Sequence, residues 1–163
     1  MSSKQIKQLS LAGVMAALVF VMTYVPKIPV PVTGGYVHLG DGMIFLSVML
    51  LGPVGIAASA VGSALADLVG GYMTYLPATF LIKGAVALIA WAFTRKDSWL
   101  RSALAFTLAE CAMVAGYFAF ECLLYGAPAA LGAVLPNVMQ GLAGVMVGLL
   151  CRTLTPRLKS VIH

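Results

Sequence analysis

The feature that most constrains the fold is a succession of six apolar runs. They cover residues 9–25, 41–51, 54–69, 78–93, 102–125 and 131–151, and short segments rich in glycine, proline or charge separate them. The longer runs approach or exceed the roughly 20 apolar residues that a helix needs to cross a bilayer core. Because lipid offers backbone polar groups no partner, such runs cross a membrane as helices. We therefore expect six transmembrane helices in one bundle.

Composition excludes a water-soluble alternative. The chain has 163 residues, of which 61% are hydrophobic and only 9% are charged, whereas an ordinary soluble domain carries about a quarter charged residues. A domain of this size has too little interior to bury so much apolar surface. The sequence predicts an all-α integral membrane protein with a single domain over residues 1–163.

The basic residues between the runs predict the orientation in the membrane. Six alternating spans place both termini on one side, and that side collects eight Lys and Arg residues, whereas the other holds only Lys27. The eight are Lys4, Lys7, Arg95, Lys96, Arg101, Arg152, Arg157 and Lys159. Since cytoplasmic loops carry the excess of Lys and Arg, both termini are expected to be cytoplasmic. No aromatic residues interleave with this charge, so it does not indicate nucleic-acid binding.

Residues 26–40 interrupt the helical pattern. Three prolines favour an extended path, and Gly34 with Gly35 permits a turn. The segment is the longest irregular one in the chain, and it is too apolar for a solvated linker. We interpret it as a lid that folds back over the bundle. His38 within it is either a ligand contact or an interfacial side chain.

Polar side chains inside and beside the apolar runs gather at one depth, near the outer side. Asp41 begins one run, Asp67 lies near the end of the next, and Lys83 lies about a turn and a half into the fourth. Tyr75, Tyr117, Glu121, Asn137 and Gln140 lie at similar levels. Such residues are costly in lipid and usually face a cavity or a partner. A pocket open to the outside therefore explains their shared depth.

The same side chains allow two other interpretations. Lys83 could pair with Asp67 or with Glu110, a carboxyl near mid-membrane, since buried ions need partners. Glu110 or Asp67 could also carry an ion in a standalone secondary transporter. The sequence leaves both possibilities open.

Motifs of catalysis and of metal binding are missing from the sequence. GxxxxGK[ST], GxSxG and HExxH do not occur. Cys111, Cys122 and Cys151 stand singly in apolar surroundings, which favours buried hydrophobes over metal ligands. We expect no catalytic residue, no metal, no cofactor and no ATP site in this chain.

Small residues in the first run define a smooth helix face. Ala12 and Ala16 are four residues apart, and Gly13 and Ala17 repeat this spacing one step round the helix. Faces of this kind let another helix approach closely. That helix could belong to the chain's own bundle or to another subunit, and the spacing does not decide between them.

Three sets of residues together resemble the substrate-binding S components of energy-coupling factor (ECF) transporters, which import vitamins into bacteria. One is the Ala12–Ala16 face. Another is GYVHLGDGMIFLSVMLLGP at residues 35–53 with ALADLVGGYMTYLPATFLIKG at residues 64–84, and the third is PNVMQG at residues 136–141. The second set is most similar to the branch linked to pyridoxine or to hydroxymethylpyrimidine, a precursor of thiamine.

The resemblance implies a function, a location and partners. An S component binds a small water-soluble vitamin in an outward pocket capped by its first long loop, in the bacterial cell membrane. It docks through its first helix, here at Ala12 and Ala16, on a coupling subunit that carries two ATPase subunits. The implied ligand contacts are His38, Asp41, Lys83, Tyr117, Glu121, Asn137 and Gln140, with Asp67 and Tyr75 as weaker candidates. A standalone ion-coupled secondary transporter is the alternative, and a small membrane enzyme is a more distant one.

Overall fold

Six helices and one short hairpin make up the chain. The computed structural model describes residues 2–95 and 98–162. The helices are α1 (Ser3–Tyr24), α2 (Gly40–Leu51), α3 (Pro53–Gly70), α4 (Leu76–Phe93), α5 (Trp99–Tyr125) and α6 (Ala127–Ile162), and strands β1 (Ile28–Val30) and β2 (Gly35–Val37) lie between α1 and α2. Five of these helices are long and apolar enough to cross a membrane. The structure therefore confirms the expected helical membrane architecture, with five helices long and apolar enough to span.

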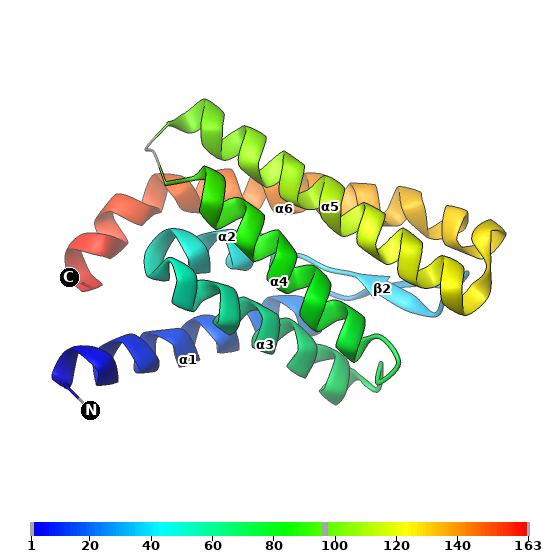
Figure 1. The fold of residues 1–163 in the computed structure, drawn as a ribbon, viewed down its shortest axis with the longest axis horizontal. Helices are drawn as coiled ribbons and strands as arrows, with labels where there is room; N and C mark the ends of the chain where they lie inside the picture. Colours follow the sequence, from blue (N-terminus) through cyan, green and yellow to red (C-terminus); the bar gives the residue numbers. More distant parts are fainter. Residues whose placement is uncertain (1, 96–97, 163) are drawn as a thin grey trace.

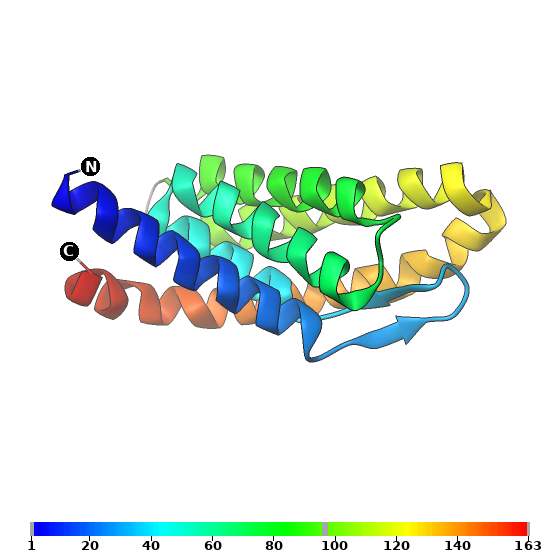
Figure 2. The same ribbon diagram turned by 90° about the horizontal axis from the view of Figure 1, so that it is seen from below.

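The helices alternate in direction along one long axis. Figures 1 and 2 show that α1 begins and α6 ends at the same end of the bundle, while the hairpin extends toward the opposite end. Glycines with positive φ make two of the tight connections, Gly52 between α2 and α3 and Gly126 between α5 and α6. The alternation keeps the polar ends of several helices together beside the hairpin.

Helix α2 is the centre of the bundle. It has only 12 residues, about 18 Å of helix, and so cannot cross a bilayer core of about 30 Å by itself. It packs instead against α1, α3, α4 and α6, and a helix that is apolar on every side is one that is buried. Phe45 of α2 stacks on Phe106 of α5 with ring centroids 4.1 Å apart. This central position carries Asp41 into the interior.

The small-residue face of α1 is divided between the bundle and its surface. A side chain at Gly62 of α3 would collide with the backbone oxygen of Ala16, so α1 and α3 approach closely there. Ala12 and Ala16 are partly buried, whereas Gly13 and Ala17 are exposed. The packing of α1 against α3 therefore explains why residue 16 is small. It leaves Gly13 and Ala17 exposed.

The helix bounds differ from the bounds of the predicted segments at three places. α1 begins at Ser3 rather than residue 9, because Ser2 and Gln5 form a capping box. α6 covers most of the predicted turn at 126–130 and of the basic tail after residue 151. Proline is tolerated in a first helical turn, and a helix can continue beyond its apolar run. His163, and residues 96–97 of the predicted polar break, lie outside the described residues.

The segment at residues 26–40 is more regular than expected. Its strands pair antiparallel, with Ile28 opposite Val37 and Val30 opposite Gly35. β-branched residues favour strands, and prolines are tolerated on edge strands such as these. The turn contains Gly34 at φ 66°. The predicted irregular loop is therefore a two-stranded hairpin.

Candidate functional site

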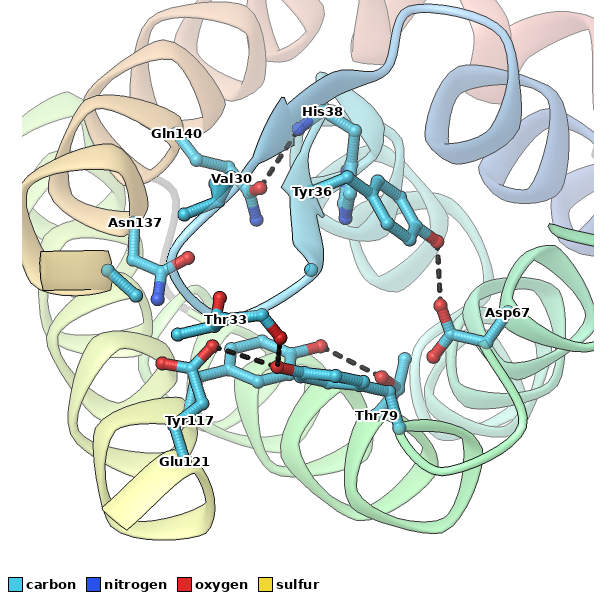
Figure 3. A pocket seen from close by; sticks show the side chains of 13 residues that line it. Val30, Thr33, Tyr36, His38, Asp67, Thr79, Tyr117, Glu121, Asn137 and Gln140 are labelled. Carbon is cyan, nitrogen blue, oxygen red and sulfur yellow. Dashed lines mark hydrogen bonds between the residues drawn. The ribbon is translucent and has the colours of Figure 1, made fainter. Parts of the chain in front are cut away.

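A cavity lies beneath the hairpin, between it and the adjacent ends of α3, α4, α5 and α6 (Figure 3). The space within it that a water-sized molecule can occupy is about 30 Å³. Its walls are Val30, Thr33, Gly35, Tyr36, His38, Asp67, Tyr75, Thr79, Tyr117, Glu121, Ala133, Asn137 and Gln140. The segment that we interpreted as a lid therefore forms one wall of a polar cavity.

Two tyrosines fasten the hairpin to the helices. The Tyr36 hydroxyl donates to Asp67 Oδ1 at 2.6 Å. The Tyr75 hydroxyl lies 3.2 Å from both the Thr33 carbonyl oxygen and Glu121 Oε1, and its single proton can serve only one of them at a time. Burial, reinforced by Asp67, raises the pKa of Tyr36 above its usual range. Tyr36 therefore stays protonated and acts as a donor.

A chain of hydrogen bonds leads from the hairpin into the bundle through Gln140. The backbone N–H of His38 donates to Gln140 Oε1 at 2.9 Å, and Gln140 Nε2 donates to Asp41 Oδ2 at 2.8 Å. His38 Nδ1 accepts from the backbone N–H of Gly40 at 3.0 Å. Burial, with the Lys83 cation as a second cause, lowers the pKa of His38 to about 3. The ring is therefore neutral at physiological pH and carries its proton on Nε2.

Asp41 and Lys83 lie below the cavity rather than in its walls. Lys83 Nζ is 2.6 Å from Asp41 Oδ1, and both side chains are fully buried. The suggested pairing of Lys83 with Asp67 or Glu110 is therefore wrong. The sequence could not show this, because the ion pair depends on the central position of α2, which brings Asp41 against α4. Lys83 Nζ also lies 5.5 Å from the ring centroid of Tyr117, so it contacts a cavity residue without lining the cavity.

Seven of the nine predicted contacts line the cavity. They are His38, Asp67, Tyr75, Tyr117, Glu121, Asn137 and Gln140. Sequence reasoning missed Val30, Thr33, Gly35, Tyr36, Thr79 and Ala133. The sequence could have indicated Thr79, because this residue lies one turn before Lys83 on the same helix face. In the structure its hydroxyl is 3.1 Å from the hydroxyl of Tyr117. The hairpin residues could be found only by knowing the strand register.

Glu110 lies outside the cavity. It is 4% exposed, packs against Gly141 and Gly144 of α6, and borders a groove between α5 and α6. Neither of its carboxyl oxygens has a hydrogen-bond partner within residues 2–95 and 98–162. Glu110 is therefore a buried carboxyl outside the cavity, and it lies close to the ion pair, because Gly144 borders both its Oε1 and Asp41 Cβ.

Within the part of the chain that the structure describes, no group of three His, Cys, Asp or Glu side chains could hold a metal ion. The three cysteines are free, and only Cys151 is buried. The expectation of buried cysteines was wrong for Cys111, which is exposed. An exposed position on a membrane helix can be as apolar as a core position, since it faces lipid.

The fold and the cavity together define a membrane-embedded binding protein: an apolar helical bundle that encloses polar side chains beneath a hairpin. The family model described as the S component of an ECF-type riboflavin transporter matches residues 3–155. The chain belongs to the S components of ECF transporters, which are substrate-binding subunits and not enzymes. The resemblance noted in the sequence is confirmed.

Relatives cover most of the chain. A thiamine precursor transporter, HmpT of Lactococcus lactis, is 31% identical over 160 residues, which cover 96% of this chain and 90% of that protein. An uncharacterised protein of Pyrococcus woesei is 36% identical over 132 residues, 80% of this chain and 88% of the relative. The crystal structure of an S component for biotin superposes with a TM-score of 0.67 over 98% of this chain and 95% of its own, at 16% identity. That structure supports the fold alone.

Proposed function

We propose that this S component captures a small thiamine precursor of the hydroxymethylpyrimidine type, or pyridoxine, for import. The observation that carries the proposal is the cavity beneath the hairpin, whose polar walls come from helices far apart in sequence. The similarity to a thiamine precursor transporter over nearly the whole chain supports the same ligand class. Small heteroaromatic rings suit these walls, because Tyr117 offers a ring for stacking and Asn137 offers an amide for hydrogen bonding.

Orientation and partners form part of the same proposal. The cavity faces outward across a bacterial cell membrane, and both termini are cytoplasmic, which agrees with the excess of Lys and Arg at their end. Energy comes from two ATPase subunits held by a membrane coupling subunit. The chain docks on that subunit through the small residues of α1. Gly13 and Ala17 are the exposed members of this region, beside the partly buried Ala12 and Ala16.

Ligand release is the first test of the binding function. Protein purified in detergent is denatured, and the released small molecules are identified by mass spectrometry. The empty protein is then titrated with hydroxymethylpyrimidine and pyridoxine. We expect one of these compounds to be present or to bind stoichiometrically. A protein that carries no vitamin and ignores a vitamin panel would contradict the proposal.

Docking can be tested separately from binding. Gly13→Trp and Ala17→Trp place a bulky ring on the exposed part of the face, where a Cβ at Gly13 has nothing within 4 Å. We expect unchanged ligand affinity and a loss of ATP-dependent uptake. Leu104→Trp, at a 62% exposed position on α5, is the matched control and should transport normally. Normal uptake by both α1 variants would move the docking face elsewhere.

One observation favours an ion-coupled secondary transporter instead. Glu110 is buried without a hydrogen-bond partner among the described residues, and intramembrane carboxyls of this kind can carry protons. Uptake in cells that lack every ATPase partner, abolished by collapsing the proton gradient and by Glu110→Gln, would support this second function. The first proposal expects no uptake in such cells.

A further inference from the structure

We infer that the cavity selects a neutral or cationic nitrogen heterocycle that presents N–H or O–H donors, and that it rejects ligands carrying carboxylate or phosphate. The selecting groups are Asp67 and Glu121. This inference rests on the proposed function and deepens it, because it states the charge and the hydrogen-bond polarity of the substrate.

Asp67 contributes the first open acceptor. Its side chain lies at the end of α3, lines the cavity and is 2% exposed. Oδ1 accepts from Tyr36, whereas Oδ2 is buried without a hydrogen-bond partner among the described residues. A buried acceptor left unpaired costs free energy. A ligand N–H or O–H at this atom would remove that cost.

Glu121 contributes the second open acceptor, from another side of the cavity. It is 3% exposed, and its Oε1 shares the Tyr75 proton with Thr33. Its Oε2 is buried and has no hydrogen-bond partner in residues 2–95 and 98–162. Figure 3 shows Asp67 on α3 and Glu121 on α5 approaching the cavity from different directions. A small ligand with donors on separate edges can therefore satisfy both carboxyls.

Two cations lie near these acids but outside the cavity wall: Lys83 beneath it, and Lys27, whose Nζ is 4.9 Å from the centroid of the Tyr36 ring. None of the described residues that line it is Lys or Arg. The Lys83 cation beneath it is held by Asp41 at 2.6 Å, and the His38 ring is neutral with Nδ1 already occupied. An anionic ligand would find no Lys or Arg among the described lining residues to pair with it, and burying an unpaired charge is costly. The cavity therefore favours a neutral or positively charged ligand.

The remaining polar groups of the cavity can form hydrogen bonds with the other edge of such a ligand. His38 can donate from Nε2, and the amide of Asn137, which has no hydrogen bond to the rest of the described chain, can donate to a ring nitrogen. Asn137 is 8% exposed and lies across the cavity from Asp67 in Figure 3. Carboxyl acceptors together with these donors suit an amino group placed next to a ring nitrogen.

A set of matched ligands tests the inference on the full chain in detergent. Calorimetric titration compares hydroxymethylpyrimidine, which carries an exocyclic amino group, with its phosphate ester and with the analogue in which hydrogen replaces the amino group. We expect the ester to bind at least about 100-fold more weakly and the analogue at least about tenfold more weakly. Pyridoxine and its phosphate form a second pair, with the same expected order.

Variants then assign the selectivity to the two acids. Glu121→Gln and Asp67→Asn keep the side-chain shape and remove the charge. Each should weaken binding of the amino compound by about tenfold or more and reduce the preference over the phosphate ester. Glu110→Gln, a buried acid outside the cavity, is the matched control and should change neither value. Thermal unfolding and the elution profile verify that each variant is folded.

Each outcome has a distinct meaning. If the phosphate ester or an anionic vitamin such as biotin binds at least as tightly as the neutral compounds, the inference fails while the S-component function stands. The same holds if Asp67→Asn and Glu121→Gln both bind and discriminate like the wild type. If no vitamin in the panel binds to the folded wild-type protein, the proposed substrate class fails, and the inference fails with it.

Discussion

The buried acids near the hairpin end of the bundle differ in how fully they are paired. Asp41 with its partners forms a paired set, and Asp67 with Glu121 forms an open set. Asp41 has both oxygens occupied, one by Lys83 and one by Gln140. Asp67 and Glu121 each keep one oxygen without a hydrogen-bond partner in the described chain. The first set lies beneath the cavity and the second set lines it. The comparison indicates that paired groups hold this end together, while open groups are available to a ligand.

The difference follows from where each acid sits. Asp41 is on the central helix α2, where all four neighbouring helices exclude water and lipid, so its charge needs a full complement of partners. Asp67 and Glu121 lie at helix ends beside a hairpin. The hairpin donates to Asp67 through the Tyr36 hydroxyl, whereas its Thr33 carbonyl competes with Glu121 for the Tyr75 proton. A binding cavity retains unpaired polar groups because the ligand supplies their missing hydrogen-bond partners.

The largest expected effect is on the paired set. Lys83→Ala should destabilise the protein by about 3–5 kcal/mol, because it leaves Asp41 buried without its counterion. Unfolding in detergent, followed by heat or denaturant, measures this cost. The expected loss of binding would then be secondary to the loss of structure.

A double variant separates this structural role from ligand contact. Asp41→Leu with Lys83→Met removes both charges and should recover most of the lost stability, since apolar replacements of buried ion pairs are often tolerated. If Lys83→Ala were instead fully stable and unable to bind ligand, Lys83 would be a direct contact, and the division between the two sets would break down.

A smaller effect is expected from the bond that joins the hairpin to the open set. Tyr36→Phe removes the 2.6 Å hydrogen bond to Asp67, and hydrogen bonds to charged groups contribute about 1.5–3 kcal/mol. We expect ligand dissociation to accelerate by about tenfold or more, because the hairpin loses one of the hydrogen bonds that join it to the helices. Stopped-flow release of bound ligand measures this rate.

The control for Tyr36 is its neighbour Tyr72, whose ring lies 4.5 Å from that of Tyr36 between centroids. Tyr72→Phe keeps this ring contact and should leave dissociation unchanged. Equal rates for Tyr36→Phe and the wild type would show that the hairpin does not depend on this hydrogen bond.

His38 predicts a pH dependence at the boundary between the two sets. Its pKa is lowered from 6.5 to about 3 by burial, so the unfolded chain binds a proton in this range while the folded chain does not. The contribution to stability is therefore complete above pH 6.5 and is lost as the pH falls toward 3, by up to about 1.4 kcal/mol per pH unit. His38→Asn, whose side-chain oxygen can replace Nδ1 as acceptor, should flatten the unfolding profile between pH 6.5 and 5. Parallel profiles for both proteins would contradict the neutral, buried ring.

Much of the fold could be predicted because lipid imposes a simple rule on sequence. Each apolar run became a helix, since the backbone must satisfy itself within the membrane. Hydropathy does not distinguish a helix that faces lipid from one that faces protein, so the central position of α2 was not predictable. The pairing of Ile28 with Val37 was hidden as well, because prolines obscure the alternation that marks a strand.

The sequence predicted the depth of the site residues in the membrane, but not the direction in which their side chains point. Equal depth grouped Glu121 with Asn137 correctly, because the ends of neighbouring helices meet at the same level. Depth could not show that Lys83 turns toward Asp41, because that depends on which helices are neighbours. Tyr36 was missed for a related reason: its contact with Asp67 exists only when the hairpin is folded over α3.

The smallest expected effect belongs to Glu110, an open acid that lies outside the cavity. Glu110→Gln keeps the shape and removes a carboxyl whose oxygens have no hydrogen-bond partner among the described residues, so no hydrogen bond shown by the structure is lost. We expect unfolding free energy to change by less than about 1 kcal/mol, or to rise, because a neutral amide is less costly to bury than an acid. Ligand affinity, measured by the same titration, should not change. A strong loss of affinity would mean that an unpaired acid can act from outside the cavity wall, and position alone would then no longer separate the structural acids from the binding acids.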